Sequence, residues 1–300
     1  MRRGLLPAGV AGPADLARLL GEVGYLADQG VATAAYLALA LPRPLLLEGE
    51  AGTGKTSLAH ALSQVLGAEL LRLQCYEGID ASQALYDWDF PRQLLHLRAA
   101  EAAGNADADR LEAEVYSRRF LLARPLLAAL ETTPSVLLVD EVDRADDEFE
   151  AFLLEVLSDY TVSVPELGTI RADVPPVVIV TSNRTREVHD ALKRRCLYHW
   201  VEHPSFEREV AIVRRRVPAA SASLAGQVAS ASQALRRADL LKPPGVAETI
   251  DWALALVALG ADRLDADTAT ATLGAVLKYR EDQERAAKLD VGEMVRAVLG

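Results

Sequence analysis

The chain has 300 residues, of which 50% are hydrophobic and 25% are charged, and these proportions exclude a disordered, fibrous or collagen-like protein. Its 43 acidic and 32 basic residues leave a net charge of −11, which argues against a general nucleic-acid binder because such proteins present a basic surface. The length is enough for two domains.

The sequence gives no sign of membrane insertion or export. The longest apolar stretch, residues 31–41, is much shorter than the ~20 residues that a membrane span needs. The first residues resemble the start of a signal peptide, but prolines and glycines interrupt the apolar region that should follow. Cys75 and Cys196 cannot form a disulfide framework or a metal cluster by themselves and fit a reducing compartment. We therefore expect a cytoplasmic protein without a membrane span.

The first third of the chain predicts a parallel crossover unit. A helical lead-in is expected over about residues 15–41, and a short apolar strand follows over 44–47. That strand ends in a glycine-rich turn, 49–54, and a helix is expected over 55–66. A second strand is expected over 70–75. Strand, loop, helix and strand in this order favour parallel strands joined by a helix.

The middle of the chain predicts three more strands of the same sheet. The apolar runs at 136–139, 177–180 and 197–201 are typical of buried parallel strands, and helical stretches separate them. Alternating residues and a turn between 161 and 171 predict a hairpin that projects from the sheet. We therefore expect an α/β fold with a parallel five-stranded core and helices on both faces.

After Pro204 the strand signal ends and helical patterns take over. The Ala/Ser-rich segment 219–234 keeps apolar residues at a spacing of three to four, which favours a helix over a linker. We therefore expect two domains: an α/β core over residues 1–204 and a C-terminal helical lid over 205–300.

Residues 49–56 fit the phosphate-binding pattern G-x-x-x-x-G-K-[ST], between a predicted strand and a predicted helix. Glycines there let backbone N–H groups converge on phosphates, and the helix N-terminus adds positive potential. We expect Lys55 to reach the β- and γ-phosphates, Thr56 to offer its hydroxyl to Mg²⁺ and Ser57 to contact the α-phosphate. The residues expected to bind the nucleotide are Gly49, Glu50, Ala51, Gly52, Thr53, Gly54, Lys55, Thr56 and Ser57.

Two carboxylates end the predicted strand before residue 140, at the sheet edge where parallel sheets bind ligands. We expect Asp140 to hold Mg²⁺, directly or through water, and Glu141 to orient or deprotonate an attacking water. The alternative is an acidic first turn of a helix, which residues 143–148 resemble. Asn183 follows the next core strand, within reach of the γ-phosphate and the water, although asparagine is also common in turns.

A basic cluster, residues 193–195, ends a helix-like stretch just before the last predicted strand. These cations could complement the C-terminus of the helix. Alternatively, one of them could be an arginine finger that reaches the γ-phosphate bound by a neighbouring subunit. The residues alone leave both readings open.

Taken together, these segments resemble AAA+ ATPases of the MoxR branch, over nearly the whole chain. The segments 49–56, 138–145, 181–187 and 191–196 are similar to the Walker A, Walker B, sensor 1 and finger segments of that branch. Residues 76–98 are similar to the insert that these ATPases carry after their second strand. The resemblance implies a P-loop NTPase fold, ATP and Mg²⁺ as ligands, and a homo-oligomer in the form of a hexameric ring.

Within that branch, Tyr-Asp-Trp at 86–88 and Arg-Arg-Cys at 194–196 are most similar to CoxD-like members, which are associated with the maturation of molybdenum-containing hydroxylases. This resemblance implies a chaperone-like remodelling ATPase with a von Willebrand A-type partner and a metalloenzyme client. By position, Arg195 matches the family's finger and Arg194 is a second candidate. The lid departs from the pattern, because Glu248 stands where an arginine, sensor 2, is usual.

The leading hypothesis is therefore ATP hydrolysis between subunits, with Lys55, Glu141 and Asn183 acting in one subunit and Arg195 or Arg194 supplied by its neighbour. Two alternatives stay open: a metal-chelatase-type motor, and a nucleotide-switched binding module with little turnover. A nucleic-acid motor is disfavoured by the net charge of −11.

Overall fold

The computed structural model describes residues 5–103 and 108–289, which divide into two compact units. Of the described residues, the first unit comprises 5–16, 29–48, 59–103 and 108–199. The second comprises 17–28, 49–58 and 200–289. The glycine-rich segment thus groups with the C-terminal helices, although it is joined directly to a strand of the first unit. The domain boundary expected after residue 204 stays a prediction.

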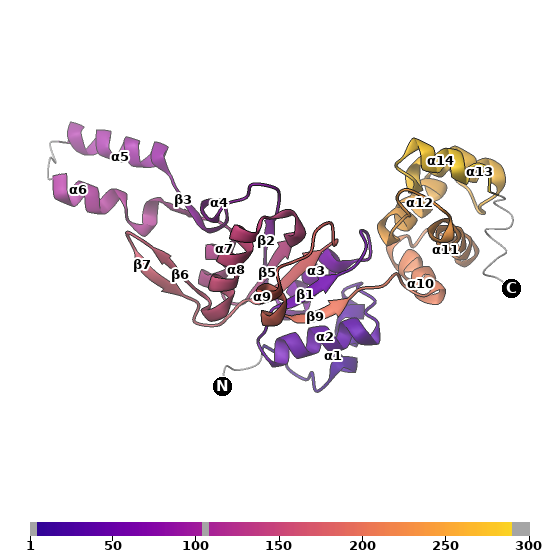
Figure 1. Ribbon diagram of the computed structural model, residues 1–300, viewed down its shortest axis with the longest axis horizontal. Helices are drawn as coiled ribbons and strands as arrows, with labels where there is room; N and C mark the ends of the chain where they lie inside the picture. The colour runs from indigo at the N-terminus through magenta and orange to yellow at the C-terminus, as the bar shows by residue number, and fades with distance from the viewer. Residues whose placement is uncertain (1–4, 104–107, 290–300) are drawn as a thin grey trace. The chain divides into compact units, whose positions relative to one another are not determined.

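A five-stranded sheet forms the centre of the first unit, in the order β2-β5-β8-β1-β9 (Figure 1). The strands are β1 (Leu45–Glu48), β2 (Glu69–Gln74), β5 (Ser135–Asp140), β8 (Val177–Ser182) and β9 (Leu197–Trp200). The pairs β2–β5, β5–β8 and β8–β1 are parallel. The predicted five-stranded parallel core is confirmed.

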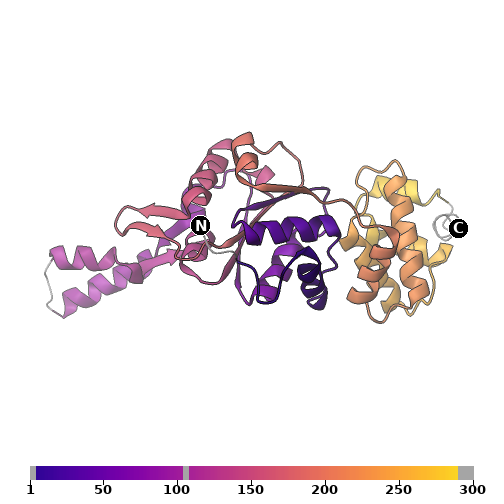
Figure 2. The same cartoon turned by 90° about the horizontal axis from the view of Figure 1, so that it is seen from below.

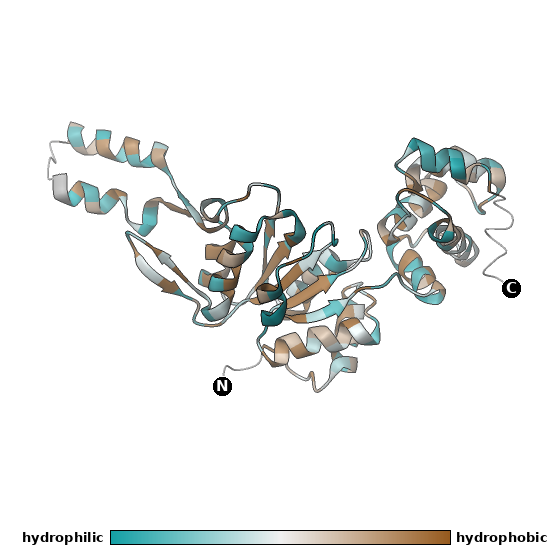
Figure 3. Cartoon of the chain, in the orientation of Figure 1, coloured by the Kyte–Doolittle hydropathy of each residue, from teal (hydrophilic) through white to brown (hydrophobic). Residues whose placement is uncertain are grey.

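The three inner strands are apolar because both faces of the sheet are covered. Every residue of β1, β5 and β8 is buried, and Leu46, Leu137 and Val180 belong to one core cluster. Figure 3 shows these strands in brown, the colour of hydrophobic residues. β2 lies at the edge of the sheet and alternates polar and apolar residues. Since an edge strand is only partly covered, it can carry polar side chains beside the carboxyl end of β5.

The helices between the N-terminus and β9 differ in two places from those expected from the sequence. The lead-in, expected as one helix, forms two helices with a non-helical segment between them, and the helix-like stretch before the last strand is a short helix over Asp190–Arg195. α7 packs against β2 and β5, and α2 packs against β1. The helices are α1 (Pro13–Glu22), α2 (Gln29–Ala40), α3 (Lys55–Leu66), α7 (Pro125–Glu131), η2 (Val142–Arg144), α8 (Asp147–Asp159) and α9 (Asp190–Arg195).

The predicted hairpin is confirmed. It consists of β6 (Thr161–Val164) and β7 (Gly168–Arg171), which pair in antiparallel fashion between α8 and β8. Gly168 has a positive φ of 80°, a conformation that glycine adopts without strain at the turn.

The insert after β2 is longer than the 76–98 expected from the sequence, because its second half returns antiparallel to the first. β3 and β4 pair as a small sheet, and α5 and α6 lie side by side beyond it (Figure 1). The Gln93 amide donates to the carbonyl of Val115 at 2.7 Å and ties the two halves together. The elements are α4 (Ala81–Leu85), β3 (Tyr86–Trp88), α5 (Phe90–Ala102), α6 (Ala108–Val115), η1 (Arg118–Phe120) and β4 (Leu121–Ala123).

The C-terminal part of the second unit is helical, as expected, and its orange to yellow helices gather in one bundle (Figure 2). Trp252 lies at the centre of its apolar core. Ser205 and Ser221 cap the first two helices by accepting backbone N–H bonds, which explains where they begin. The helices are α10 (Phe206–Arg216), α11 (Ala222–Arg237), α12 (Val246–Ala258), α13 (Ala266–Val276) and α14 (Arg280–Ala286).

A buried ionic network joins three of these helices. The Glu209 carboxylate, fully buried on α10, accepts hydrogen bonds from Arg236 of α11 at 2.6 and 2.7 Å and from the Thr249 hydroxyl of α12 at 2.8 Å. Because a buried charge without partners is costly, this network specifies how the three helices pack. Among the described residues, none of the helices combines the length and the apolar character that crossing a bilayer requires.

Candidate functional site

The glycine-rich loop connects the end of β1 to the start of α3, as expected. Gly52 and Gly54 have φ angles of 77° and 93°, which side chains larger than glycine rarely adopt. These angles let the loop turn back on itself before α3 begins at Lys55. The loop therefore has the backbone form that can direct N–H groups at an anion.

Lys55 lies inside this loop. Its ammonium group donates to the carbonyls of Gly49 and Glu50, both at 2.7 Å, and its residue surface is only 5% exposed. The loop carbonyls thus hold the lysine at the loop, where phosphate oxygens would be stronger acceptors for it. Thr56 follows at the first turn of α3.

The start of α12 contacts the loop through its backbone. The N–H of Val246 donates to the carbonyl of Gly52 at 2.9 Å. A Cβ on Gly245 would lie 2.7 Å from the Cα of Gly52, so only glycine fits there. Glu248 accepts the N–H of Gly245 at 2.9 Å and so completes the N-terminus of α12. The residue at the sensor 2 position therefore has a capping role.

Asp140 and Glu141 lie together at the carboxyl end of β5, where Thr181 of the neighbouring β8 bridges them. The Thr181 hydroxyl donates to Asp140 Oδ1 at 2.6 Å, and its oxygen accepts the Glu141 N–H at 2.9 Å. Asp140 and Thr181 are both buried. The single buried hydroxyl of Thr181 therefore fixes both the side chain of Asp140 and the backbone of Glu141.

Glu141 has a left-handed backbone, with φ 56° and ψ 51°, a conformation that costs energy for a residue other than glycine. Its carboxylate accepts the Asn183 amide at Oε1, 3.1 Å away. Oε2 accepts the Gln74 amide at 3.2 Å and pairs with Arg144 at 2.9 Å. Two of the predicted catalytic residues, Glu141 and Asn183, are therefore brought together by the structure.

The segment that carries Asn183 is fastened to the segment after β5. Asp143, 3% exposed, accepts the backbone N–H groups of Asn183 and Thr185 at 3.2 and 2.8 Å and the Thr185 hydroxyl at 2.7 Å. The buried carboxylate of Glu150 accepts the N–H of His189 at 2.7 Å and pairs with Arg186. The acidic turn at 143–150 thus has a structural role beside Asp140 and Glu141.

Arg194 and Arg195 lie apart from this cluster, at the exposed end of α9. The Arg195 guanidinium donates to the carbonyl of Ser158 at 2.6 Å, at the end of α8. Arg43 donates to the carbonyls of Arg194 and Arg195, both at 3.0 Å. The basic cluster therefore has a fixed backbone, and Arg194 and Arg195 are exposed on the first unit.

Both cysteines are buried free thiols. Burial, together with the nearby carboxylates, Asp140 first among them, raises the pKa of Cys75 to about 12. Burial also raises the pKa of Cys196 to about 12, although Arg43 and Arg195 lower it slightly. Both groups stay neutral near pH 7, so neither is an activated nucleophile.

The donor groups fit Mg²⁺ rather than a caged transition metal. Within residues 5–103 and 108–289, no group of three or more His, Cys, Asp or Glu side chains could hold a metal ion. Mg²⁺ is usually bound by one or two protein oxygen ligands together with phosphates and water. The buried carboxylate of Asp140 is an oxygen ligand of that kind.

Three residues of this cluster were not predicted from the sequence: Arg72 and Gln74 of β2, and Arg144 of η2. Arg144 lies in the recognised segment 138–145, and a fourth residue, Thr181, lies in the recognised segment 181–187, but neither was given a role of its own. Gln74 pairs in register with Asp140, so β2 places its polar side chains beside the carboxylates. The alternation of polar and apolar residues over 71–75 was the available signal, because it marks an edge strand with one polar face.

Comparison with known proteins gives a family match and similar structures. The model of the AAA domain, dynein-related subfamily, matches residues 44–196, about half of the chain. No curated protein matches the chain. The solved structure of RuvB from Thermotoga maritima, a Holliday junction branch migration motor, is 16% identical with a TM-score of 0.48, covering 95% of this chain and 76% of that one. An alanine-to-serine mutant of that RuvB gives 16% identity and a TM-score of 0.49, with 87% and 70% covered.

Proposed function

The chain belongs to the AAA domain family, dynein-related subfamily, with the P-loop AAA+ fold, and on that premise we propose that it hydrolyses ATP to ADP and phosphate with Mg²⁺. The observation that carries the proposal is the pair formed by Glu141 and Asn183 beside Asp140. A binding module without turnover has no need of a carboxylate held next to an amide at the phosphate edge of the sheet.

Nucleotide binding is assigned to the loop of residues 49–57. Its backbone N–H groups would hold the phosphates, and Lys55 would exchange its bonds to the loop carbonyls for the β- and γ-phosphate oxygens. Thr56 and Asp140 would hold Mg²⁺. Bound Mg²⁺ would neutralise charge on the phosphates.

Glu141 would act as the general base. Its Oε2 is engaged by Gln74 and Arg144, whereas Oε1 accepts only the amide of Asn183 among the described contacts, so Oε1 has a lone pair for a water. Asn183 would hold the same water from its amide. The left-handed backbone of Glu141 directs the side chain to this position and Thr181 maintains it.

Arg195 would complete the site of a neighbouring subunit, with Arg194 as the second candidate. Phosphoryl transfer develops charge on the γ-phosphate oxygens, which a guanidinium from the next subunit stabilises. The exposure of this end of α9 and its attachment to Arg43 support this role. We propose a ring of identical subunits, hexameric as in the AAA+ branch that the motifs resemble.

The finer assignment rests on the motifs at 86–88, 138–145, 181–187 and 194–196. On this basis we propose a MoxR-type, CoxD-like remodelling ATPase in the cytoplasm that assists the maturation of a metalloenzyme such as a molybdenum-containing hydroxylase. A von Willebrand A-type protein would be its partner. The separating experiment is co-expression of a molybdenum hydroxylase with the parent chain or with Glu141→Gln: active hydroxylase with the parent only would support the assignment, and equal maturation would remove it.

The ATPase proposal is tested by turnover per subunit as a function of protein concentration. An active site completed by a neighbour gains specific activity as subunits assemble, and Arg195→Ala should abolish that gain. A rate independent of concentration and of Arg195 would contradict a shared site. An absence of turnover with nucleotide still bound would instead favour the nucleotide-switched module.

A further inference from the structure

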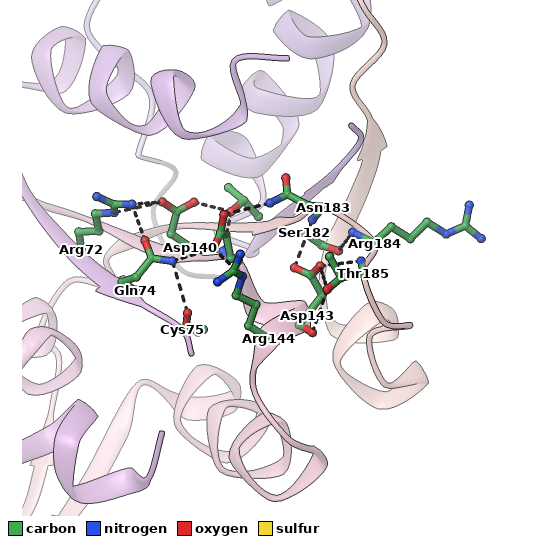
Figure 4. Close-up of polar contacts among 12 residues, drawn as sticks. Arg72, Gln74, Cys75, Asp140, Asp143, Arg144, Ser182, Asn183, Arg184 and Thr185 are labelled. Carbon is green, nitrogen blue, oxygen red and sulfur yellow. Dashed lines mark hydrogen bonds and ion pairs between the residues drawn. The ribbon is translucent and has the colours of Figure 1, made fainter. Parts of the chain in front are cut away.

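The edge strand β2 directs two polar side chains, Arg72 and Gln74, at the Asp140–Glu141 pair. Figure 4 shows Arg72 and Gln74 beside Asp140. Arg72 Nε and Nη2 lie 3.0 and 2.6 Å from Asp140 Oδ2. The side chain of Arg72 is 51% exposed, whereas that of Asp140 is 4% exposed. A surface arginine therefore reaches in to pair with a buried carboxylate that is the proposed Mg²⁺ ligand.

Gln74 extends this arrangement to the second carboxylate. It lies two residues from Arg72 and therefore on the same face of β2. Its Oε1 accepts from Arg72 Nη2, and its Nε2 donates to Glu141 Oε2 at 3.2 Å. The Arg72 guanidinium thus has two acceptors, Asp140 and Gln74. The Gln74 oxygen stays available to it when another cation binds Asp140.

We propose that Arg72 is a positioning residue that neutralises Asp140 while Mg²⁺ is absent and competes with Mg²⁺ for Asp140. This inference rests on the proposed function, since it takes Asp140 as the Mg²⁺ ligand. The Thr181 hydroxyl holds Oδ1 at 2.6 Å, so the carboxylate can keep its place when the cation on Oδ2 changes.

The physical reason is that a buried carboxylate without a cation is costly, while two cations at one carboxylate oxygen repel each other. Without Mg²⁺, the Arg72 guanidinium supplies the cation that the buried Asp140 carboxylate needs. With Mg²⁺, the half-exposed Arg72 can move toward solvent at little cost and keep its contact with Gln74. The result is a site that stays neutral when it is empty and that binds Mg²⁺ less tightly than Asp140 alone would allow.

The test is Arg72→Gln, measured by thermal unfolding in EDTA and by titration of Mg²⁺ at a fixed ADP concentration. We expect a lower unfolding temperature in EDTA and an Mg²⁺ half-saturation at least threefold lower than in the parent. Arg72→Lys keeps the charge and should stay near the parent in both. Arg98→Gln, the same change at an exposed position of α5, should alter neither.

An Mg²⁺ half-saturation in Arg72→Gln equal to or higher than that of the parent would overturn the inference. If the parent binds no Mg²⁺–ADP, the proposed function itself fails, and the two failures are thereby distinguished. Should Arg72→Gln not fold, the same change in an Asp140→Asn background decides the matter. Asp140→Asn with and without Arg72→Gln should unfold at the same temperature, and a further loss would show that Arg72 does not act through Asp140.

Discussion

The acidic segment after β5 and the basic end of α9 are both charged, yet the fold treats them in opposite ways. Asp140, Asp143 and Glu150 are each less than 4% exposed, and each is held by hydrogen bonds from its own chain. Arg194 and Arg195 are exposed. Groups proposed to act within the subunit are fixed by that subunit, whereas groups proposed to act on a neighbour are left at the surface.

The contrast has a physical basis. Buried carboxylates require partners because desolvated charge is costly, so the acidic segment is stable only as a complete network. Exposed guanidinium groups carry no such requirement. Arg43 nevertheless fixes the carbonyls at the end of α9, so the backbone there is ordered while the side chains stay accessible.

The largest loss of ATP turnover is expected from a change at the exposed end of α9. Arg195→Ala should reduce ATP turnover about a thousandfold, because the developing charge on the γ-phosphate loses its guanidinium. Steady-state hydrolysis at a protein concentration that saturates assembly measures it, with Arg194→Ala as the matched control. A greater loss with Arg194→Ala would move the finger role to Arg194.

A smaller loss is expected when the base is neutralised within the buried network. Glu141→Gln should reduce turnover about a hundredfold or more while nucleotide affinity stays near that of the parent, because the amide cannot accept a proton. Turnover and calorimetric nucleotide binding should be measured on the same preparation. Hydrolysis at the parent's rate would remove Glu141 as the base.

The role of Asp143 in holding the segment that carries Asn183 is tested by the free energy of unfolding. Asp143→Ala should lower the free energy of unfolding by about 2–3 kcal/mol, because two backbone N–H groups and a hydroxyl lose their acceptor. Asp147→Ala removes an exposed carboxylate of the same segment and should cost less than about 1 kcal/mol. Urea denaturation of both variants measures the difference, and equal losses would show that burial of Asp143 contributes nothing.

The smallest effect is expected in the chemical reactivity of the two buried thiols, Cys75 and Cys196. Burial raises the pKa of Cys75 and Cys196 to about 12, so both stay protonated at pH 8 and should react slowly with a disulfide reagent in the native protein. Both should react at the ordinary rate in urea, where the pKa returns to its usual range. A fast native reaction at either cysteine would contradict its burial.

The sequence predicted the inner strands well because burial on both faces demands continuous apolar runs, as in β5 and β8. It predicted the insert poorly. β3 and β4 have three residues each, too few for a periodic signal, and they pair across more than 30 residues. The lead-in was expected as one helix because the apolar spacing continues across the break.

The candidate site likewise contains residues that could be predicted from the sequence and residues that could not. Asp140, Glu141 and Asn183 could be predicted because each ends a strand or directly follows one, and parallel strands end at one edge. Arg72 could not be assigned to Asp140 because that contact depends on the register of β2 against β5, which no local pattern specifies. Thr181 joins both carboxylate residues only because β8 lies next to β5.

The most direct test of the central claim mixes the two inactive variants, Glu141→Gln and Arg195→Ala. In a ring assembled at random from equal amounts, about a quarter of the interfaces would combine an intact Glu141 with an intact Arg195 from the neighbour. The account predicts that the mixture regains about a quarter of the parent's turnover, although each variant alone is inactive. A mixture as inactive as its components would contradict an active site shared between subunits.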